Sequence, residues 1–388
     1  MVYLETVHKN LKQYILENNY MGYNPYDVYA SDMIYGRFFG RKYISVLFTQ
    51  LNKISPFNFR KQLGIPKTNS PKAVALIILA LIEEGFEKNK SEIEYLINWL
   101  LDNKSDTYDQ YTIGFFFPIS LSMYSSEINH PSLIITLFAI YAFIEYYKYS
   151  KSEKVLDAIL SFEYLISSKL PVFEDKNELY YSYNFERFNE VYNATAKVGK
   201  FYSMLYEINK DSSLLIKIEK ILNYLQKNQS EDGSWLYRKG ISYSDSFHTA
   251  FILEAIYQMR KQVDHPVYTE MFKKGLEDYL KSFILPDGQP LYIHPRYGNK
   301  GKRKFFEVTK TDIRDSANAI LFLSEINKTD IAQKVYQWTV SNMYDNKKGY
   351  FHFYKEKYWK NRIEYIRPQG WMLYASSKLI KVNQNKFL

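Results

Sequence analysis

The sequence predicts an all-α fold, an (α/α) toroid of about six helical hairpins with long aromatic loops at one end of the ring. Three observations lead to this prediction. Apolar helical segments alternate with amphipathic ones along most of the chain. Their starts recur at roughly 55–65 residues, a spacing that fits two helices and a sizeable loop. The loops between them are rich in aromatic residues.

The chain begins with an amphipathic segment, residues 1–19, and a turn-rich stretch, Gly22–Asp27. We expect a helix from about Ser31 to Leu51 and an irregular segment at Ser55–Arg60. Strongly apolar helices should then start near Pro71, Pro131, Asn193, Asp245, Asp312 and Pro368. Amphipathic partners follow the first five at Ser91–Leu101, Ser152–Ser167, Ser212–Gln226, Val267–Phe283 and Ile331–Met343. We predict a single domain, residues 1–388, in which residues 1–70 close the ring and residues 71–388 form the repeated hairpins.

Helices that are apolar nearly all round are buried, so they should form an inner ring with the amphipathic helices outside it. In such a ring the inner helices run parallel and their N-termini open at one end. The aromatic loops that precede them are Tyr108–Pro118, Glu178–Phe188, Gly233–Tyr243, Gly288–Phe306 and Gly349–Arg367. Positive helix ends beside these loops should attract a carboxylate, phosphate or sulfate.

Composition narrows the classes of function. A net charge of +9 and 38 tyrosines favour an anionic partner with a surface suited to ring stacking. Lys and Arg are scattered and no nucleic-acid-binding motif occurs, so nucleic acid is not expected. Cys is absent, and there is neither a P-loop nor a strand followed by GxGxxG; we therefore expect no metal and no cofactor.

The N-terminus does not read as a signal peptide, and no run of 18 or more apolar residues is present. We expect a soluble, cytoplasmic protein without a transmembrane segment. Peripheral membrane association is compatible with this pattern, and nothing indicates an oligomeric state.

The candidate catalytic residues centre on the stretch Gln229–Arg260. His248 lies one turn into its helix, where it could face the mouth or be a hydrogen-bonded core residue. Asp245 is first an N-cap and second a catalytic acid. Tyr243 lies on the preceding loop and could supply a hydroxyl.

Two further helix starts carry polar residues. Asn193 could cap its helix or bind a substrate carboxylate, and Arg314 is the second candidate for that carboxylate. Asp312 and Asp315 share a face and could form a structural cluster with Arg314 or a carboxylate pair. The candidate substrate-binding residues are Trp235, Tyr192, Tyr237, Asp312, Asp315, Arg296, Arg367 and Trp371. Among these, Trp235 is expected to be exposed on a hairpin and to stack on a sugar ring, and Arg296 opens the basic run RYGNKGKRK.

Six stretches resemble one protein family along nearly the full length. They are GYNPYD (Gly22–Asp27), SPFNFRKQLGI (Ser55–Ile65), VYNAT (Val191–Thr195), EDGSW with DSFHTAF (Glu231–Phe251), TDIRDSANAI (Thr311–Ile320) and RPQGWM (Arg367–Met372). In this order they are similar to squalene-cyclase-like, or prenyltransferase-repeat, toroid proteins associated with surface-polysaccharide biosynthesis. The resemblance implies an α/α toroid and a glycan setting.

Four functions remain open. The first is proton abstraction at C5 of an acidic, uronate-containing saccharide or lipid-linked oligosaccharide by an epimerase or a lyase, with Tyr243 and His248 as base and acid and with Asn193 and Arg314 or Arg367 on the carboxylate. The second is glycoside hydrolysis by Asp245 with Asp312 or Asp315. The third is a non-catalytic glycan-binding toroid, and the fourth is an isoprenoid-cyclase-like protein.

Overall fold

A computed structural model describes residues 2–55, 57–120, 125–241, 243–298, 310–356 and 360–385. Over these ranges the chain is mainly α-helical, with strands of two or three residues confined to the loops. The prediction of an all-α fold is confirmed. The chain divides into two compact units, residues 1–142 with 339–388 and residues 143–338, and the boundaries fall within α6 (Leu133–Ser150) and α14 (Thr329–Met343).

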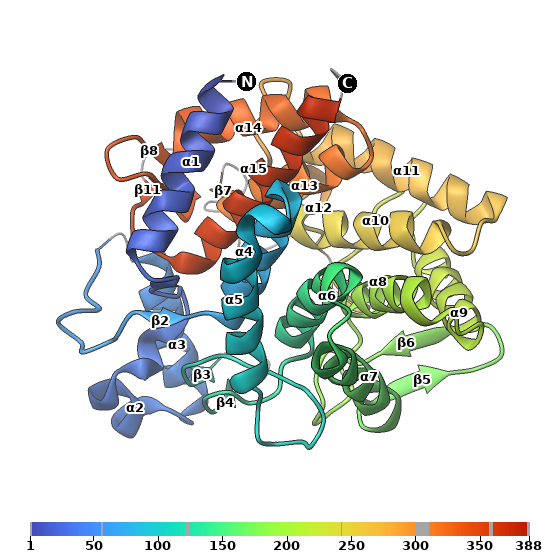
Figure 1. The fold of residues 1–388 in the computed structure, drawn as a ribbon, viewed down its shortest axis with the longest axis horizontal. Coiled ribbons are helices and arrows are strands. Elements are labelled where there is room, and N and C mark those ends of the chain that lie inside the picture. The colour runs from blue at the N-terminus through green and yellow to red at the C-terminus, as the bar shows by residue number, and fades with distance from the viewer. Residues whose placement is uncertain are drawn as a thin grey trace. The chain divides into compact units, whose positions relative to one another are not determined.

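The unit formed by residues 1–142 and 339–388 is built on two parallel helices, α4 (Pro71–Glu84) and α15 (Ile366–Asn385) (Figure 1). Near their starts, Lys72 Nζ lies 5.2 Å from the ring of Trp371, and near their ends Lys378 pairs with Glu83 at 3.1 Å. Helix α5 (Lys90–Asp102) packs against α4, and α1 (Val2–Glu17) packs against α15.

Burial follows hydrophobic periodicity in α4 and α5. Every residue of α4 from 71 to 82 is buried, because this helix is apolar on all sides and begins with Pro71 at a position that needs no N–H donor. In α5 the buried residues recur at helical spacing, namely Ile93, Leu96, Ile97 and Leu100. The expectation of a buried helix followed by an amphipathic partner is therefore confirmed for this hairpin.

The unit formed by residues 143–338 contains three parallel inner helices, α8 (Tyr192–Asn209), α10 (Ser246–Arg260) and α13 (Ile313–Glu325). Polar contacts between matching turns show their register. Lys200 of α8 pairs with Glu254 of α10 at 2.6 Å, and Ser203 Oγ donates to the Gln258 carbonyl at 3.0 Å. On the other side of α10, Asn318 Nδ2 donates to the Phe247 carbonyl at 3.0 Å and Gln258 donates to Glu325 at 3.1 Å. The N-termini of the three helices therefore lie at the same end of this unit.

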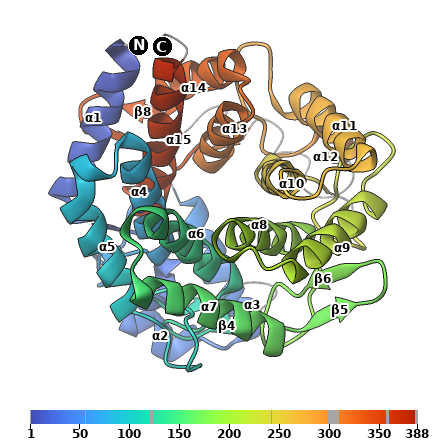
Figure 2. The same cartoon turned by 45° about the vertical axis from the view of Figure 1, so that its right-hand side comes forward.

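Amphipathic helices accompany these three. Figure 2 shows α9 (Ser213–Lys227) beside α8 and α11 (Pro266–Phe283) beside α10. Helix α7 (Glu153–Ser168) is tied to α9 by a Lys217–Glu163 ion pair of 3.0 Å. Short helical segments are η1 (Asp27–Ala30), α2 (Asp32–Phe38), α3 (Lys42–Ile54), η2 (Glu87–Asn89) and α12 (Pro295–Gly298).

The strands form small antiparallel pairs in the loops. They are β1 (Met21–Gly22) with β2 (Thr68–Asn69), β3 (Ile119–Ser120) with β4 (Ser125–Ser126), β5 (Val172–Glu174) with β6 (Leu179–Tyr181), β8 (Tyr344–Asp345) with β9 (Tyr350–Phe351), and β10 (Tyr354–Lys355) with β11 (Lys360–Asn361). Strand β7 (Thr311–Asp312) leads directly into α13.

Two Asp-Gly turns each pack against the backbone of the next hairpin. Gly233, with φ +92°, faces the backbone of α11, and a Cβ at this position would lie 2.3 Å from the Lys274 carbonyl oxygen. Gly288, with φ +93°, faces α14, and its Cβ would lie 2.4 Å from the Lys334 carbonyl oxygen. Both positions therefore require glycine for two reasons, the left-handed backbone and the close approach of a helix.

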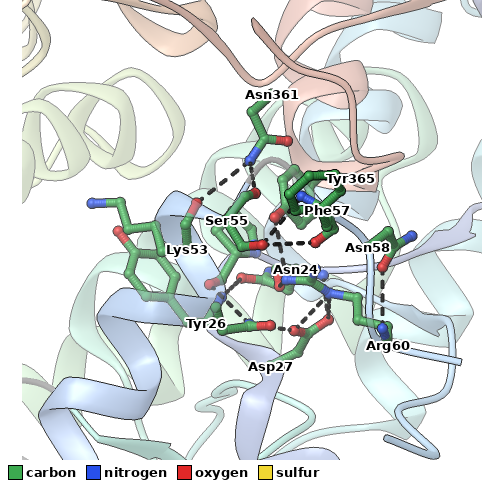
Figure 3. Close-up of polar contacts among 12 residues, drawn as sticks. Asn24, Tyr26, Asp27, Lys53, Ser55, Phe57, Asn58, Arg60, Asn361 and Tyr365 are labelled. Atoms are coloured by element: carbon green, nitrogen blue, oxygen red, sulfur yellow. Dashed lines mark hydrogen bonds and ion pairs between the residues drawn. The ribbon is translucent and has the colours of Figure 1, made fainter. Parts of the chain in front are cut away.

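A buried ion pair anchors the N-terminal segment (Figure 3). Asp27 and Arg60 are 3% and 1% exposed, and Arg60 Nε lies 3.0 Å from Asp27 Oδ1. Asp27 also accepts from Asn24 N at 2.8 Å and Asn52 Nδ2 at 3.0 Å, while Arg60 Nη2 donates to the Tyr365 hydroxyl at 3.2 Å. Burial raises the pKa of Asp27 despite the adjacent guanidinium. The pair thus joins residues 24–27, 52–60 and 365, which are far apart in sequence.

We expect Arg60→Met to lower the free energy of unfolding by about 3–5 kcal/mol, because it leaves a buried carboxylate without its cation. The double variant Asp27→Asn/Arg60→Met should lose less than the sum of the single variants, since it buries no isolated charge. Urea denaturation measures both. Additive losses would show that the two side chains do not act as a pair.

The ends of α4 and α15 are joined to α1 by a second polar cluster. Glu84 accepts from Lys12 at 2.7 Å and pairs with His8 Nε2 at 3.0 Å, and His8 Nδ1 lies 2.7 Å from Ser376 Oγ. Burial alone would raise the pKa of Glu84, but His8 and Lys12 outweigh it and lower the pKa to about 2.

Because of this lowered pKa, the free energy of unfolding depends on pH between the unfolded and the folded pKa of Glu84. The Glu84 carboxylate contributes stability above the unfolded value of 4.5, and that contribution is lost as the pH falls through the folded value of about 2. The full contribution is about 3 kcal/mol. Between these two pH values, we expect the free energy of unfolding to decrease less in Glu84→Gln than in the unaltered protein. Identical acid limbs in the two proteins would contradict this assignment.

Candidate functional site

The candidate site lies at the N-terminal ends of α10 and α13, where two polar first turns meet. We use the term His248 cluster for Tyr237, Tyr243, Asp245, His248 and Tyr292. All of these belong to the unit of residues 143–338.

Asp245 and His248 form a hydrogen-bonded dyad. Asp245 is the N-cap of α10, and its Oδ1 accepts from the backbone N–H of His248 at 2.9 Å. The same carboxylate lies 2.8 and 2.7 Å, through Oδ1 and Oδ2, from His248 Nδ1. The i, i+3 spacing places both groups on one turn, so one carboxylate serves as helix cap and as imidazole partner.

The two members of the dyad differ in exposure. The Asp245 side chain is 2% exposed and that of His248 is 27% exposed. Because a carboxylate accepts the hydrogen bond, the proton of the neutral imidazole belongs on Nδ1 and the lone pair on Nε2. Nε2 makes no hydrogen bond within the part of the chain that the structure describes. The dyad therefore presents a basic nitrogen at a partly exposed position.

Aromatic rings hold the imidazole in place. The ring of Tyr237 meets His248 edge-on at 4.7 Å, and Tyr243 stacks on Tyr237 at 5.3 Å with 10° between the planes. Tyr237 N also donates to the Tyr243 carbonyl at 2.9 Å, which closes the hairpin that carries both rings. Burial raises the pKa of the Tyr237 hydroxyl. Tyr243 is half-buried and lies next to the dyad in this stack.

The first turn of α13 carries a buried charged cluster. Asp312 is the N-cap and forms a capping box with Asp315. Arg314 binds Asp312 with two hydrogen bonds, 2.8 Å from Nε and 2.6 Å from Nη2. Arg314 also lies over the ring of Phe247, the residue before His248, at 5.2 Å. Of the two roles predicted for these carboxylates, the geometry matches the structural Arg–Asp cluster.

The pKa values of the two aspartates of α13 are shifted in opposite directions. Burial raises the pKa of Asp312, but Arg314 outweighs burial and lowers it. Burial and then the charges of Asp312 and Asp245 raise the pKa of Asp315 well above its ordinary value. The Asp315 side chain is fully buried, and its Oδ1 has no hydrogen-bond partner among the described residues. Of the two aspartates of α13, Asp315 is the one whose surroundings favour the protonated carboxyl group.

Asn193 lies in the first turn of α8 but does not cap it. Val191 occupies the N-cap position, so the capping role expected for Asn193 is wrong. Asn193 is 2% exposed, and its Oδ1 accepts no hydrogen bond from a described residue. The register of α8 and α10 places it beside the first turn of α10. The neighbouring Tyr192 is buried and donates to Asn228 Oδ1 at 3.2 Å, and burial followed by Glu190 raises its pKa to about 12.

The expectation that Trp235 is exposed is wrong. Its side chain is 1% exposed, and its Nε1 donates to the Leu225 carbonyl at 2.9 Å. Gly275 of α11 leaves room for it, since a Cβ there would lie 2.6 Å from the indole. The hairpin folds inward at this point, and Trp235 fills the core between α9 and α11 instead of facing a sugar.

Arg296 lies in α12, is exposed and pairs with Asp232. The rest of the predicted basic run, residues 299–304, lies outside the described residues, so its position at a mouth stays a prediction.

The remaining two candidates, Arg367 and Trp371, belong to the unit of residues 1–142 and 339–388. Both are buried in the first turns of α15. Arg367 lies 5.5 Å from the ring of Tyr26, and Trp371 meets Phe138 edge-on at 5.3 Å. Lys72 Nζ lies 4.0 Å from the same Phe138 ring. Here cations and rings also gather at helix starts; their role with His248 stays a prediction.

The sequence analysis missed two residues of this region. Tyr292 is half-buried, its carbonyl accepts from Ser246 N at 3.1 Å, and burial and then Asp245 raise its pKa. Lys197 is 1% exposed, with its Nζ 3.3 Å from the centre of the Phe251 ring, and burial lowers its pKa well below the usual range. A lysine four residues after Asn193 in an apolar helix was a readable signal for Lys197. Tyr292 lies in a loop, where no periodicity marks it.

Within the described ranges no group of three or more His, Asp or Glu side chains is arranged to hold a metal ion. None of the described helices is both long and apolar enough to cross a bilayer.

Comparison with known proteins identifies the fold. No family model matches the chain, and no curated protein matches it. Among solved structures, the chain is similar to a cellobiose 2-epimerase from Bacillus thermoamylovorans, with a TM-score of 0.64 and 15% identity over 83% of this chain and 90% of that one. It is also similar to a polysaccharide lyase (TM-score 0.52, 13% identity, covering 82% and 92%) and to a family 88 glycosyl hydrolase from Bacteroides vulgatus (0.53, 12%, 81% and 94%). The fold is that of the α/α-toroid class, as the sequence predicted.

The dyad makes a testable statement about the histidine tautomer. We expect 15N NMR of the neutral imidazole to show the proton of His248 on Nδ1. In Asp245→Asn the amide oxygen should keep the cap, so the NH2 group faces Nδ1 and moves the proton to Nε2. Helix α10 should remain as stable as before. Finding the Nε2-protonated form in the unaltered protein would contradict the geometry described here.

Proposed function

We propose that this protein is a carbohydrate-active enzyme in which His248 moves a proton at a sugar carbon. The observation that carries the proposal is the Asp245–His248 dyad, whose Nε2 lies at a partly exposed helix start and bonds to none of the described residues. The similarity to solved structures described as an epimerase and a polysaccharide lyase supports it, because both names belong to enzymes that act on saccharides.

The dyad suits general-base catalysis. When Nε2 takes a proton, the imidazole becomes a cation, and the buried Asp245 carboxylate lies 2.7 Å from Nδ1 to stabilise it. The rings of Tyr237 and Phe247 on either side restrict rotation of the imidazole. The base is thus oriented before a substrate arrives.

We propose an acidic, uronate-containing saccharide as the substrate. A net charge of +9 and the parallel N-termini of α8, α10 and α13 favour a carboxylate at this end of the unit. Asn193 is the candidate donor to that carboxylate, since its amide lies in the first turn of α8. Arg314 already binds Asp312 through two nitrogens, so its contribution would be mainly electrostatic.

In the proposed step the C5–H bond breaks and the proton passes to His248 Nε2. The electron pair left on C5 delocalises into the carboxylate, which gains enolate character. In an epimerase, Tyr243 then returns a proton to the opposite face of C5. In a lyase, the electron pair forms the C4–C5 double bond while the C4–O bond breaks with its electrons on the leaving oxygen, and Tyr243 gives its proton to that oxygen.

The second candidate, glycoside hydrolysis by Asp245 with Asp312 or Asp315, gains support from the similarity to a family 88 glycosyl hydrolase. The carboxylates favour it less. All three are at most 3% exposed, Asp245 is engaged by His248, and Asp312 is engaged by Arg314. Hydrolysis needs one carboxylate on each side of a sugar. A non-catalytic glycan-binding toroid has lost its main stacking candidate, because Trp235 is buried.

The resemblance in the sequence supports placing this reaction in a cytoplasmic step of surface-polysaccharide or glycoconjugate synthesis, on a free or lipid-linked saccharide. The isoprenoid-cyclase-like alternative rests on the same sequence resemblance alone. No described contact of the His248 cluster favours it.

Solvent exchange tests the proposal. Incubation with uronate-containing oligosaccharides in D2O should place deuterium at C5, detected by NMR, or should yield an unsaturated uronate. His248→Gln should lose turnover by about a hundredfold or more, and Asp245→Asn should lose a similar amount with the fold retained. His265→Asn is the matched control, because His265 is an exposed histidine that caps α11 and Asn also caps.

Unchanged exchange in His248→Gln, with normal circular dichroism, would remove His248 from the mechanism. Exchange at a carbon other than C5 would keep the dyad as base and replace the uronate as substrate.

A further inference from the structure

Helix α3 (Lys42–Ile54) has its apolar residues facing outward. The side chains of Tyr43, Leu47 and Leu51 recur every four residues, so they form one stripe, and they are 81%, 55% and 50% exposed. Ile44 extends the stripe and is 39% exposed. In a helix on the surface of a water-soluble domain, such residues are expected to face the core.

The inward face of α3 carries polar residues beside the half-buried Phe48, which packs against the core. Ser45 and Thr49 are fully buried, and Asn52 is half-buried. Ser45 Oγ donates to the Phe38 carbonyl at 2.6 Å, and Thr49 Oγ1 donates to the Ser45 carbonyl at 3.1 Å.

Two further contacts fix the rotation of α3. Asn52 Nδ2 donates to Asp27 Oδ1 at 3.0 Å, which ties the helix to the buried Asp27–Arg60 pair (Figure 3), and the Tyr29 hydroxyl donates to the Ser45 carbonyl at 2.9 Å. With these polar groups bonded inward, the stripe of Tyr43, Leu47 and Leu51 faces outward.

More exposed apolar side chains lie next to α3 in the sequence. Phe57 and Phe59 are 67% and 54% exposed with their rings 6.0 Å apart, and Met33 of α2 is 53% exposed. On soluble proteins, exposed apolar patches mark surfaces that bind another protein, a membrane or a ligand. We call the stripe of α3 together with Phe57 and Phe59 the α3 face.

The charges in the segment that carries the α3 face are mainly positive. Residues 32–61 include one acidic residue, Asp32, and six basic ones: Arg37, Arg41, Lys42, Lys53, Arg60 and Lys61. Arg60 is neutralised by Asp27, whereas Arg37, Arg41 and Lys61 are exposed. Aliphatic and aromatic side chains beside exposed cations are the composition of interfacial segments that lie on anionic bilayers. In a two-fold contact between copies the same cations would face each other, which disfavours self-association.

We propose that the α3 face binds the surface of an anionic lipid bilayer and holds the protein there as a peripheral membrane protein. The leucines and aromatic rings enter the headgroup region, and the surrounding arginines and lysines contact lipid phosphates. The proposal is independent of the reaction at His248, which lies in the other unit.

Vesicle flotation tests this proposal with the full-length protein. It should float with vesicles of equimolar phosphatidylglycerol and phosphatidylcholine, and much less with phosphatidylcholine alone. Leu47→Gln/Leu51→Gln should weaken binding roughly tenfold or more. Arg37→Gln/Arg41→Gln should weaken it roughly tenfold, and added salt should do the same.

Ile216→Gln is the matched control, since Ile216 is a 59% exposed aliphatic residue on α9 in the other unit. It should bind like the unaltered protein. The leucine variant should keep its melting temperature, because both side chains are already exposed.

Three results would overturn the proposal. The first is protein that stays unbound with the anionic vesicles. The second is equal binding by the leucine variant and the unaltered protein. The third is sedimentation velocity that shows a dimer which Leu47→Gln/Leu51→Gln dissociates, since the α3 face would then be covered by a second copy.

Discussion

The parallel register of α8, α10 and α13 is the constraint on which the candidate site depends. Four polar contacts between these helices set it, from the buried bond of Asn318 near the start of α10 to the partly buried bond of Glu325 near its end. An apolar interface alone would tolerate a shift along the helix axes, whereas a buried donor that loses its acceptor costs free energy at once. The first turns of the helices therefore lie at one end of the unit, although α8 and α13 begin more than 100 residues apart in sequence.

Burial and neighbouring charges then shift the pKa values of the two aspartates of α13. Asp245 and Asp312 are nearly equally buried, and each has a partner: the imidazole of His248 and the guanidinium of Arg314. Asp315 has no such partner and lies near both carboxylates, so burial and these charges raise its pKa.

Hydrophobic periodicity predicted the helices and which of them are buried, because α4 and α5 differ in pattern as plainly as in burial. It could also predict that Asp245 caps α10 with His248 one turn later. The fate of Trp235 depends on Gly275, forty residues away, and no local pattern reports that gap. The single helix expected over residues 31–51 is divided into α2 and α3, with Gly36 and Gly40 lowering the helix propensity of the segment. The exposure of the α3 stripe could not be predicted either. A leucine stripe normally predicts a buried face, and only the structure shows that the polar residues of α3 are bonded inward.

The Asp-Gly turns at Gly233 and Gly288 have a consequence for how this chain could be rebuilt. Each turn is the point where one hairpin rests on the backbone of the next, and each makes that contact without a side chain. A contact made only to main-chain atoms does not depend on which side chains the contacted helix carries. Hairpins from a distant homologue could therefore be exchanged as cassettes, provided that each donor segment brings its own glycine turn and that the Trp235 hairpin is kept with a helix that has glycine at the position of Gly275.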